Sequence, residues 1–250
     1  MSANGRDGRT PVIAIVGTGG IGQPAVHALA DAQVALRVID DDRVEVSNLH
    51  RQILANSDDV GRLKVDVIAR ELRGRGRTDA TFHVARVTPN TAFELLAGAD
   101  VVIEGSDNYA TKFLVADACM LLGIAAVHGA AVGWLGTVLT TIPGRSACYR
   151  CVFEGPPGGD TVDCATAGVF GPVTSVVGAL MAADALRVVR HDDRYLGAVG
   201  SYDGWRNTFR STRFAPRREC PLCGTRAIQN LDPARYVAPD CGAADAVAVR

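Results

Sequence analysis

Apolar runs and helical patterns alternate along the first half of the chain. A short apolar run at 12–16 is followed by a glycine-rich turn, a helix of small residues at 23–30 and a second apolar run at 34–39. This arrangement predicts two parallel strands joined by a helix. The alternation continues with helices at 64–72, 91–96 and 109–122 and strands at 81–85, 100–104 and 125–131. The pattern predicts an α/β fold, a Rossmann-like doubly wound sheet that is mainly parallel and has helices on both faces.

The pattern changes in the second half. Residues 136–142 predict an antiparallel strand, and 198–202 with 207–212 predict a hairpin. The stretch 171–189 is long and apolar, but an acidic and a basic residue interrupt it and small residues recur at helical spacing. We therefore expect antiparallel strands that extend the sheet, and a buried core helix rather than a membrane span.

The composition limits which cellular compartment and which classes of partner are expected for this protein. The chain has 26 basic and 27 acidic side chains, and a formal net charge of −1 gives no long-range attraction for nucleic acid or for an anionic membrane. The seven cysteines are an odd number, and no secretory leader precedes them. We therefore expect a cytoplasmic protein that needs no disulfides to fold.

Four of the cysteines form two close pairs, Cys148 with Cys151 in CYRC and Cys220 with Cys223 in CPLC. Each C-x-x-C presents two thiolates from one backbone turn, and two such pairs complete a Cys₄ structural zinc site. A disulfide or a redox-active C-x-x-C is the alternative. Thioredoxin-type motifs open a helix directly after a strand, whereas the proline and glycine of CPLCG favour a zinc knuckle.

Four glycines, Gly17, Gly19, Gly20 and Gly22, separate the first strand from the first helix. Because they lack a Cβ, backbone N–H groups there can approach a phosphate at the helix N-terminus. Asp40, at the end of the second strand, is placed to accept hydrogen bonds from ribose hydroxyls. These features predict a nucleotide site, and they suit NAD in a dehydrogenase equally well.

The segment after the second strand, DDDRVEVSNLHRQ, favours a triphosphate. A nucleotide that loses pyrophosphate needs cations and amides over the leaving phosphates, and a carboxylate that holds magnesium there. Arg51, Asn48 and Lys64 meet the first need and Asp107 the second. Taken singly, each cation has the alternative of being an ordinary surface charge, and Ser106 or Asp107 that of a helix cap. Their order along the chain favours ATP.

A series of motifs within residues 12–224 resembles one family. In chain order they are GTGGIG, DDDRVEVSNLHRQ, GRLK, SDN, CYRC, DCATAGVFGPV and CPLCG. Together they resemble the ThiF/MoeB/HesA family, which is similar to the adenylating half of ubiquitin-activating enzymes. Its members use ATP and magnesium to adenylate the C-terminal glycine of a small ubiquitin-like sulfur carrier.

The resemblance implies roles for particular positions. It puts Asp40 at the ribose, Asp107 at the magnesium and the four paired cysteines at a structural zinc. The predicted ATP-binding set is Gly17, Gly19, Gly20, Gly22, Asp40, Asp42, Ser47, Asn48, Arg51, Gln52, Lys64, Asp107 and Asn108. The predicted catalytic set is Arg51, Lys64, Asp107 and Cys164.

Cys164 precedes Thr166 and Gly168 in a stretch rich in glycine and proline. The resemblance implies that it handles sulfur as a nucleophile, through a thioester or an acyl disulfide. A helix N-terminus nearby would depress its pKa. The alternative is a small apolar residue packed at the helix start. Because no rhodanese-like extension is recognised, a separate sulfur donor protein is expected.

Members of the family usually carry an N-terminal helix whose arginine crosses a dimer interface to the ATP. Here the first predicted strand begins at residue 12, and Arg6 and Arg9 are the available arginines before it. The trans-arginine arrangement is therefore not expected in its usual form, and a homodimer is left open.

The predicted organisation is one domain in four segments. They are a flexible N-terminus (1–10), a nucleotide-binding α/β half (11–143), a zinc-knuckled carrier-binding half (144–224) and a tail or surface wrap (225–250). The predicted function is ATP-dependent adenylation of a β-grasp sulfur carrier ending in Gly-Gly, with thiocarboxylate formation as an optional second step. The alternatives are activation of a peptide C-terminus in natural-product biosynthesis and a non-catalytic nucleotide-binding protein.

Overall fold

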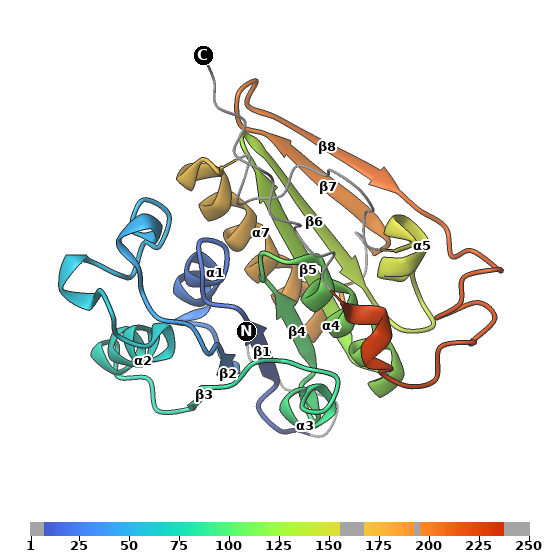
Figure 1. Cartoon of the computed structure of the whole chain (residues 1–250), viewed down its shortest axis with the longest axis horizontal. Coiled ribbons are helices and arrows are strands. Elements are labelled where there is room, and N and C mark those ends of the chain that lie inside the picture. Colours follow the sequence, from blue (N-terminus) through green and yellow to red (C-terminus); the bar gives the residue numbers. More distant parts are fainter. Residues whose placement is uncertain (1–7, 156–167, 193–195, 238–250) are drawn as a thin grey trace, which may run out of the picture.

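A computed structural model describes residues 8–155, 168–192 and 196–237 of the chain. The described strands form one eight-stranded sheet in the order β3-β2-β1-β4-β5-β6-β7-β8 (Figure 1). Their bounds are β1 Val12–Val16, β2 Ala35–Ile39, β3 Ala80–His83, β4 Val101–Glu104, β5 Ala125–Val132, β6 Leu135–Thr141, β7 Ala198–Asp203 and β8 Thr208–Arg213. The first five strands in sequence pair in parallel, and β5 to β8 pair antiparallel. The predicted sheet, its antiparallel extension and the hairpin are confirmed.

Helices cover both faces of the sheet, as predicted. One face carries α1 Gly22–Leu29, α2 Lys64–Gly74 and α7 Gly171–Val189, and the other carries α3 Ala92–Leu96, α4 Tyr109–Leu122 and α5 Tyr149–Phe153. Alternate residues of β1 divide between two cores: Ile13 and Ile15 pack with α1, α2 and α7, whereas Ala14 and Val16 pack with α3 and α4. This alternation follows from the two-residue period of a strand.

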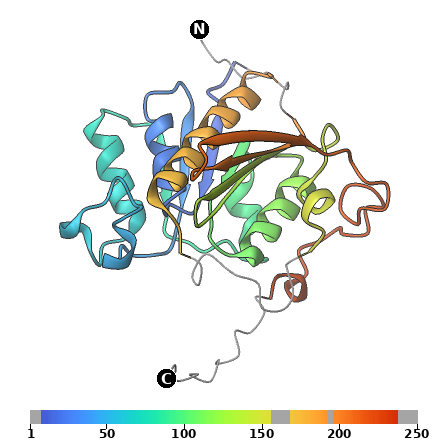
Figure 2. The ribbon, with the colours of Figure 1, turned by 90° about the horizontal axis from the view of Figure 1, so that it is seen from above.

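The long apolar helix α7 lies beside α1 and runs across β5 and β6 (Figure 2). It is the one helix among the described residues whose length and hydropathy would suffice for a membrane span. Val177, Met181 and Ala185 are fully buried against the sheet. A Cβ on Gly129 would lie 2.1 Å from the sulfur of Met181, so any larger residue there would displace the Met181 side chain. The predicted core helix is confirmed.

Short elements and turns complete the described chain. The 3₁₀ turns are η1 Val46–Asn48, η2 Ser57–Asp59 and η3 Pro233–Tyr236. The predicted strand at 81–85 is shifted: β3 begins one residue earlier, at Ala80, and ends two residues earlier, at His83, where the chain leaves the sheet and Val84 is exposed. Arg9 forms a bidentate ion pair with Asp100 at 2.7 and 2.9 Å, at the amino edge of the sheet. Arg6 lies outside the described residues.

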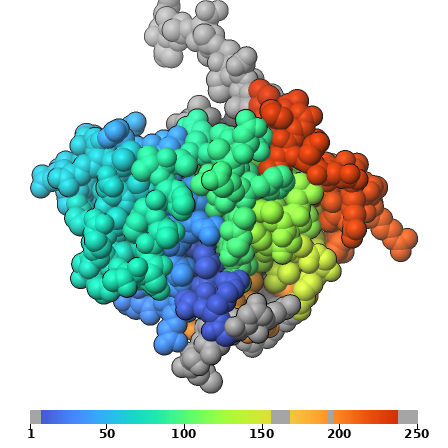
Figure 3. All heavy atoms as spheres, turned by 90° about the horizontal axis from the view of Figure 1, so that it is seen from below, coloured from blue at the N-terminus to red at the C-terminus, as the bar shows by residue number. Residues whose placement is uncertain are grey.

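Residues 225–237 follow the surface beside α4, and Figure 3 shows them in red against the green and yellow middle of the chain. Tyr236 is buried there, and its hydroxyl donates to Asp117 Oδ2 at 2.7 Å. Arg150, within the first cysteine pair, donates to both oxygens of Asp117 at 2.7 and 2.8 Å. This part of the predicted tail is therefore a wrap anchored in a buried polar network.

Candidate active site

A cleft of about 880 Å³ opens at the carboxyl ends of β1, β2 and β4. Because β1 lies between β2 and β4, this is the point where the strand order reverses, and open α/β sheets bind ligands at such a point. The cleft is lined by the glycine loop, the segment after β2, the start of α4 and the residues before α7. From the predicted set it gathers Gly17, Gly19, Gly20, Asp40, Asp42, Ser47, Asn48, Arg51, Gln52, Lys64, Asp107 and Asn108.

The glycine loop connects β1 to α1 with two close backbone approaches. Gly17 has a φ of 82°, and a Cβ there would lie 3.1 Å from Ser106 N. A Cβ on Gly22 would lie 1.9 Å from Gly17 O, so only glycine fits at the start of α1. Gly22 does not line the cleft. The expectation that Gly22 contacts the nucleotide is therefore corrected. Its role is to let the loop pack closely against the start of α1.

Asp40 fixes the glycine loop to the end of β2. Its Oδ2 accepts hydrogen bonds from Thr18 N at 2.5 Å and Thr18 Oγ1 at 2.8 Å, and its Oδ1 accepts one from Asp42 N at 2.8 Å. A carboxylate oxygen has capacity for more than one donor, so a ribose hydroxyl is still compatible with this arrangement. The sequence reading missed Thr18, whose hydroxyl is buried under the loop.

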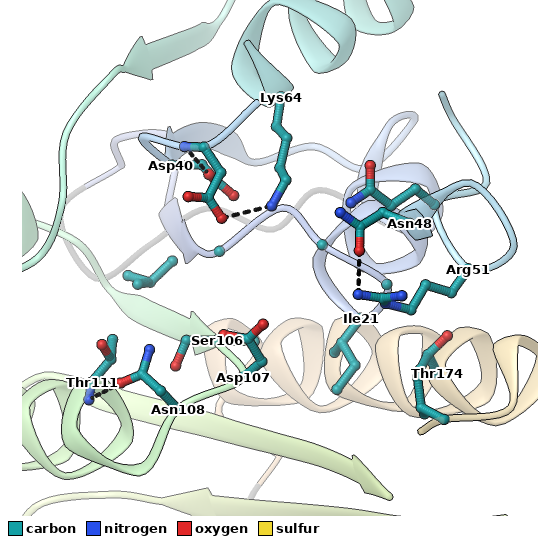
Figure 4. Close-up of a pocket in the computed structure, with 18 of the residues that line it drawn as sticks. Ile21, Asp40, Asn48, Arg51, Lys64, Ser106, Asp107, Asn108, Thr111 and Thr174 are labelled. Carbon is teal, nitrogen blue, oxygen red and sulfur yellow. Dashed lines mark hydrogen bonds and ion pairs between the residues drawn. The ribbon is translucent and has the colours of Figure 1, made fainter. Parts of the chain in front are cut away.

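Two cations lie on the wall formed by the segment after β2 (Figure 4). Arg51 donates to Asn48 Oδ1 and, at 3.3 Å, to Ser47 O, and it pairs with no carboxylate of the described residues. Lys64 Nζ lies 2.7 Å from Asp42 Oδ2. The Lys64 side chain is 10% exposed, whereas that of Asp42 is 56% exposed, so the acid has the freedom to move away.

Asp107 lies across the cleft from Lys64 (Figure 4). It is exposed, and its carboxylate forms no hydrogen bond or ion pair with the part of the chain that the structure describes. The cap of α4 is Asn108, whose Oδ1 accepts a hydrogen bond from Thr111 N at 2.8 Å. The alternative that Ser106 or Asp107 caps this helix is therefore wrong. An unpaired carboxylate in a polar cleft has the chemistry of a magnesium ligand.

The remaining predicted residues occupy the rim or the interior. Ser47 is exposed and donates to Glu45 Oε2 at 3.3 Å. Gln52 is buried and accepts a hydrogen bond from Gln23 Nε2 at 3.4 Å. Cys164 lies outside the described residues.

Sequence reasoning missed a second charged group, the pair formed by Glu104 and Lys112 in the floor of the cleft. Lys112 Nζ lies 2.9 Å from Glu104 Oε2, and Lys112 lines the cleft. The available signal was a single acidic residue at the end of the apolar run VVIE, and it identifies no partner.

The four paired cysteines come together in a separate apolar cluster. Their sulfur atoms lie within 4.8 Å of one another, with 3.5 Å between Cys148 and Cys220 and 3.3 Å between Cys151 and Cys223. Sulfurs this far apart are not disulfide-bonded. Four thiolates around zinc at about 2.3 Å stand roughly 3.8 Å apart, so the cluster fits that ion. Leu222 and Ile228 pack around it.

The second pair also fits a knuckle because of the residue that follows it. A Cβ on Gly224 would lie 2.3 Å from Arg218 O, and its N–H donates to Cys220 O at 2.9 Å. Arg217 N donates to Cys151 Sγ at 3.3 Å, which is the kind of contact that stabilises a thiolate.

Comparison with known proteins agrees with this geometry. The model of the ThiF family matches residues 7–222. The chain belongs to the ThiF family. This family member is 38% identical to the SAMP-activating enzyme E1 of Haloferax volcanii, over 90% of this chain and 84% of the relative. It is 40% identical to the sulfur carrier protein adenylyltransferase of Thermus thermophilus, over 87% of this chain and 83% of the relative.

Solved structures show the same fold. The structure of E. coli MccB with MccA-N7isoASN matches with a TM-score of 0.75 at 24% identity, over 86% of this chain and 67% of that chain. The expected α/β architecture is thereby confirmed for this ThiF-family protein.

Proposed function

We propose that this ThiF-family protein binds Mg-ATP in the cleft and adenylates the C-terminal glycine of a small ubiquitin-like sulfur carrier. One observation carries the proposal: the unpaired guanidinium of Arg51 and the unpaired carboxylate of Asp107 line one cleft around the glycine loop. A nucleotide that loses pyrophosphate needs a cation and a metal-binding acid at its phosphates, whereas hydride transfer from NAD uses neither. The names of the two relatives point to the same activity.

The proposed chemistry joins the carrier's carboxylate to AMP. A carboxylate oxygen attacks the α-phosphate, the bond to the bridging oxygen breaks, and pyrophosphate leaves with the electron pair. Arg51, Asn48 and Lys64 would stabilise the negative charge that grows on the phosphates. Asp107 would hold a magnesium ion, which supplies further charge neutralisation when it is bound.

In this proposal Lys64 has a different partner in the free and in the nucleotide-bound protein. Without nucleotide its ammonium is paired with Asp42, and a phosphate oxygen would compete for the same donor. Because Asp42 is half exposed, its carboxylate can return to water at little cost when the nucleotide arrives.

A surface for the body of the carrier adjoins the cleft. Trp134, Phe170 and Trp205 form an exposed aromatic cluster, with ring centroids 3.9 Å apart for Trp134 and Phe170 and 5.2 Å apart for Trp134 and Trp205. Val169, next to Phe170, lines the cleft. Exposed aromatic residues are typical of binding hot spots. A protein whose C-terminus enters the cleft past Val169 would rest on this cluster.

The zinc site is supported by the distances between the four sulfur atoms, and the remaining parts of the proposal rest on the sequence. The four paired cysteines would bind zinc, which stabilises the fold around it without taking part in the chemistry. Cys164 as a sulfur nucleophile, the separate sulfur donor, the homodimer and the cytoplasmic location stay predictions.

ATP–pyrophosphate exchange tests the proposed function. With Mg-ATP and a ubiquitin-like carrier ending in Gly-Gly, we expect labelled pyrophosphate to enter ATP. The matched control is the same carrier without its last glycine, which should give none. Exchange that needs no carrier would contradict the proposal, as would exchange driven only by a short peptide. Absence of exchange with every carrier, despite ATP binding, would favour a non-catalytic nucleotide-binding protein.

A further inference from the structure

A charged group that the proposed chemistry does not use lies buried directly beneath the cleft. It consists of Glu104 at the end of β4, Lys112 on α4 and His128 on β5, and we refer to these three residues as the buried triad. Glu104 is 0% exposed, and the other two are almost fully buried. Charged side chains are rarely buried to this extent unless they are paired.

The Glu104–Lys112 pair joins three elements. Glu104 Oε1 accepts hydrogen bonds from Ser106 N at 2.8 Å and from Ser106 Oγ. Its Oε2 accepts one from Lys112 Nζ at 2.9 Å, and Lys112 also donates to Gly129 O at 2.6 Å. The end of β4, the first turn of α4 and the middle of β5 are therefore bound together through the Glu104–Lys112 pair.

Glu104 is charged despite its burial. Burial by itself would raise the pKa of Glu104, but the ammonium of Lys112 and the Ser106 hydroxyl outweigh it, so the pKa is lowered to about 2. A buried ion pair contributes little net stability relative to apolar residues of similar volume, because desolvation of both charges offsets their attraction. Stability alone therefore does not account for this pair.

His128 is the third member of the buried triad. Its Nδ1 lies 3.9 Å from Glu104 Oε2, too far for a hydrogen bond, and has no hydrogen-bond partner among the described residues. Burial lowers the pKa of His128, which keeps the ring neutral. Tyr149, which follows the first cysteine of the zinc cluster, packs against the ring at 4.6 Å between centroids. The neutral ring thus lies beside the Glu104 carboxylate and against Tyr149.

The geometry explains why Asp107 has a defined place without a partner of its own. Ser106, on one side, is bound to Glu104 through both its N–H and its hydroxyl. Asn108, on the other side, is bound as the cap of α4. Asp107 is therefore held by both neighbours while its carboxylate stays free in the cleft.

We propose that Glu104, backed by His128, is a positioning residue that holds the Ser106–Asp107–Asn108 turn so that the Asp107 carboxylate is ready for the metal of the bound nucleotide. The inference rests on the proposed function, because it assigns Glu104 an effect through Asp107. Groups that orient a metal ligand typically change metal affinity by about 10- to 100-fold when they are removed.

Three variants test the positioning role through the magnesium dependence of exchange and of ATP binding. Glu104→Gln leaves Lys112 charged and unpaired, so Glu104→Gln with Lys112→Met removes both charges together. Ser106→Ala removes only the hydroxyl contact. We expect the double variant to need about tenfold more magnesium for half-maximal exchange, and Ser106→Ala about threefold more.

The matched control is the other buried pair of α4, in which Asp117→Asn is combined with Arg150→Met. This control should leave the magnesium midpoint unchanged, since Asp117 and Arg150 do not line the cleft. Folded Glu104 and Ser106 variants with the wild-type magnesium midpoint would overturn the positioning role alone. Absence of exchange and of magnesium-dependent ATP binding in the wild type would overturn the proposed function itself. Should the double variant fail to fold, Ser106→Ala decides.

Discussion

Charged side chains behave differently in the cleft and in the interior beneath α4. In the cleft, Arg51 and Asp107 have no ion-pair partner among the described residues. In the interior, Glu104 pairs with Lys112 and Asp117 pairs with Arg150, each at 2.9 Å or less. Desolvation is the cause of the contrast, because an unpaired charge is tolerated in water and costs several kcal/mol when it is buried.

The contrast separates two roles for charge. An unpaired charged side chain on the solvent-exposed wall of the cleft is available to a ligand, so its removal should affect ligand binding or catalysis. A paired charge in the buried interior orders the elements around it, so loss of one partner should affect stability or, for Glu104, the position of Asp107. The predictions below test this separation from both sides.

The largest effect is expected for Asp107→Ala. Loss of the metal-binding carboxylate should lower carrier-dependent exchange by about a thousandfold. The melting temperature should not change, because the carboxylate has no partner to lose. The measurement is exchange alongside thermal unfolding, with Asp58→Ala as the control, since Asp58 is also exposed and lies outside the cleft. Near-normal exchange in Asp107→Ala would remove this residue from the site.

The opposite result is expected for Asp117→Asn. Arg150 would stay buried without its counter-charge, so the free energy of unfolding should fall by at least about 3 kcal/mol. Denaturant unfolding gives this value, and exchange per folded molecule should stay normal. Asp79→Asn is the matched control: it removes a partly exposed pair with Arg77 and should cost less than about 1 kcal/mol. A small cost at Asp117 would contradict the distinction between the two regions.

A smaller loss is expected for Tyr236→Phe. This change removes one buried hydrogen bond to Asp117 and keeps the ring, so it should lower the free energy of unfolding by about 1 kcal/mol. Tyr202→Phe is the control, because the Tyr202 hydroxyl donates a solvent-exposed hydrogen bond to Asn207 Oδ1 at 3.2 Å. Equal effects of the two changes would show that residues 233–236 are not anchored through Asp117.

The two regions also differ in how far sequence alone reveals them. The glycine loop, Arg51 and the cysteine pairs were predictable because each belongs to a short sequence motif whose residue types and spacing indicate a particular kind of site. The pairing of Lys64 with Asp42 and of Glu104 with Lys112 was not, because each joins separate elements and no local periodicity identifies the partner. The same applies to Tyr236, whose anchor on Asp117 is distant in sequence.

The β-strand ends show a smaller version of this limit. The apolar pattern extends past His83, yet β3 ends there, because its last residue pairs with Ile39 at the end of β2. Strand length is thus set by the neighbouring strand, which a single segment does not reveal.

The intact mass of the carrier tests the central claim most directly. After incubation of this protein with Mg-ATP, a hydroxylamine-sensitive gain of one adenylyl group on the carrier's terminal glycine is expected, and Asp107→Ala should not produce it. A carrier whose mass stays unchanged although both ATP and carrier bind, or one that gains a phosphoryl group instead, would contradict the account.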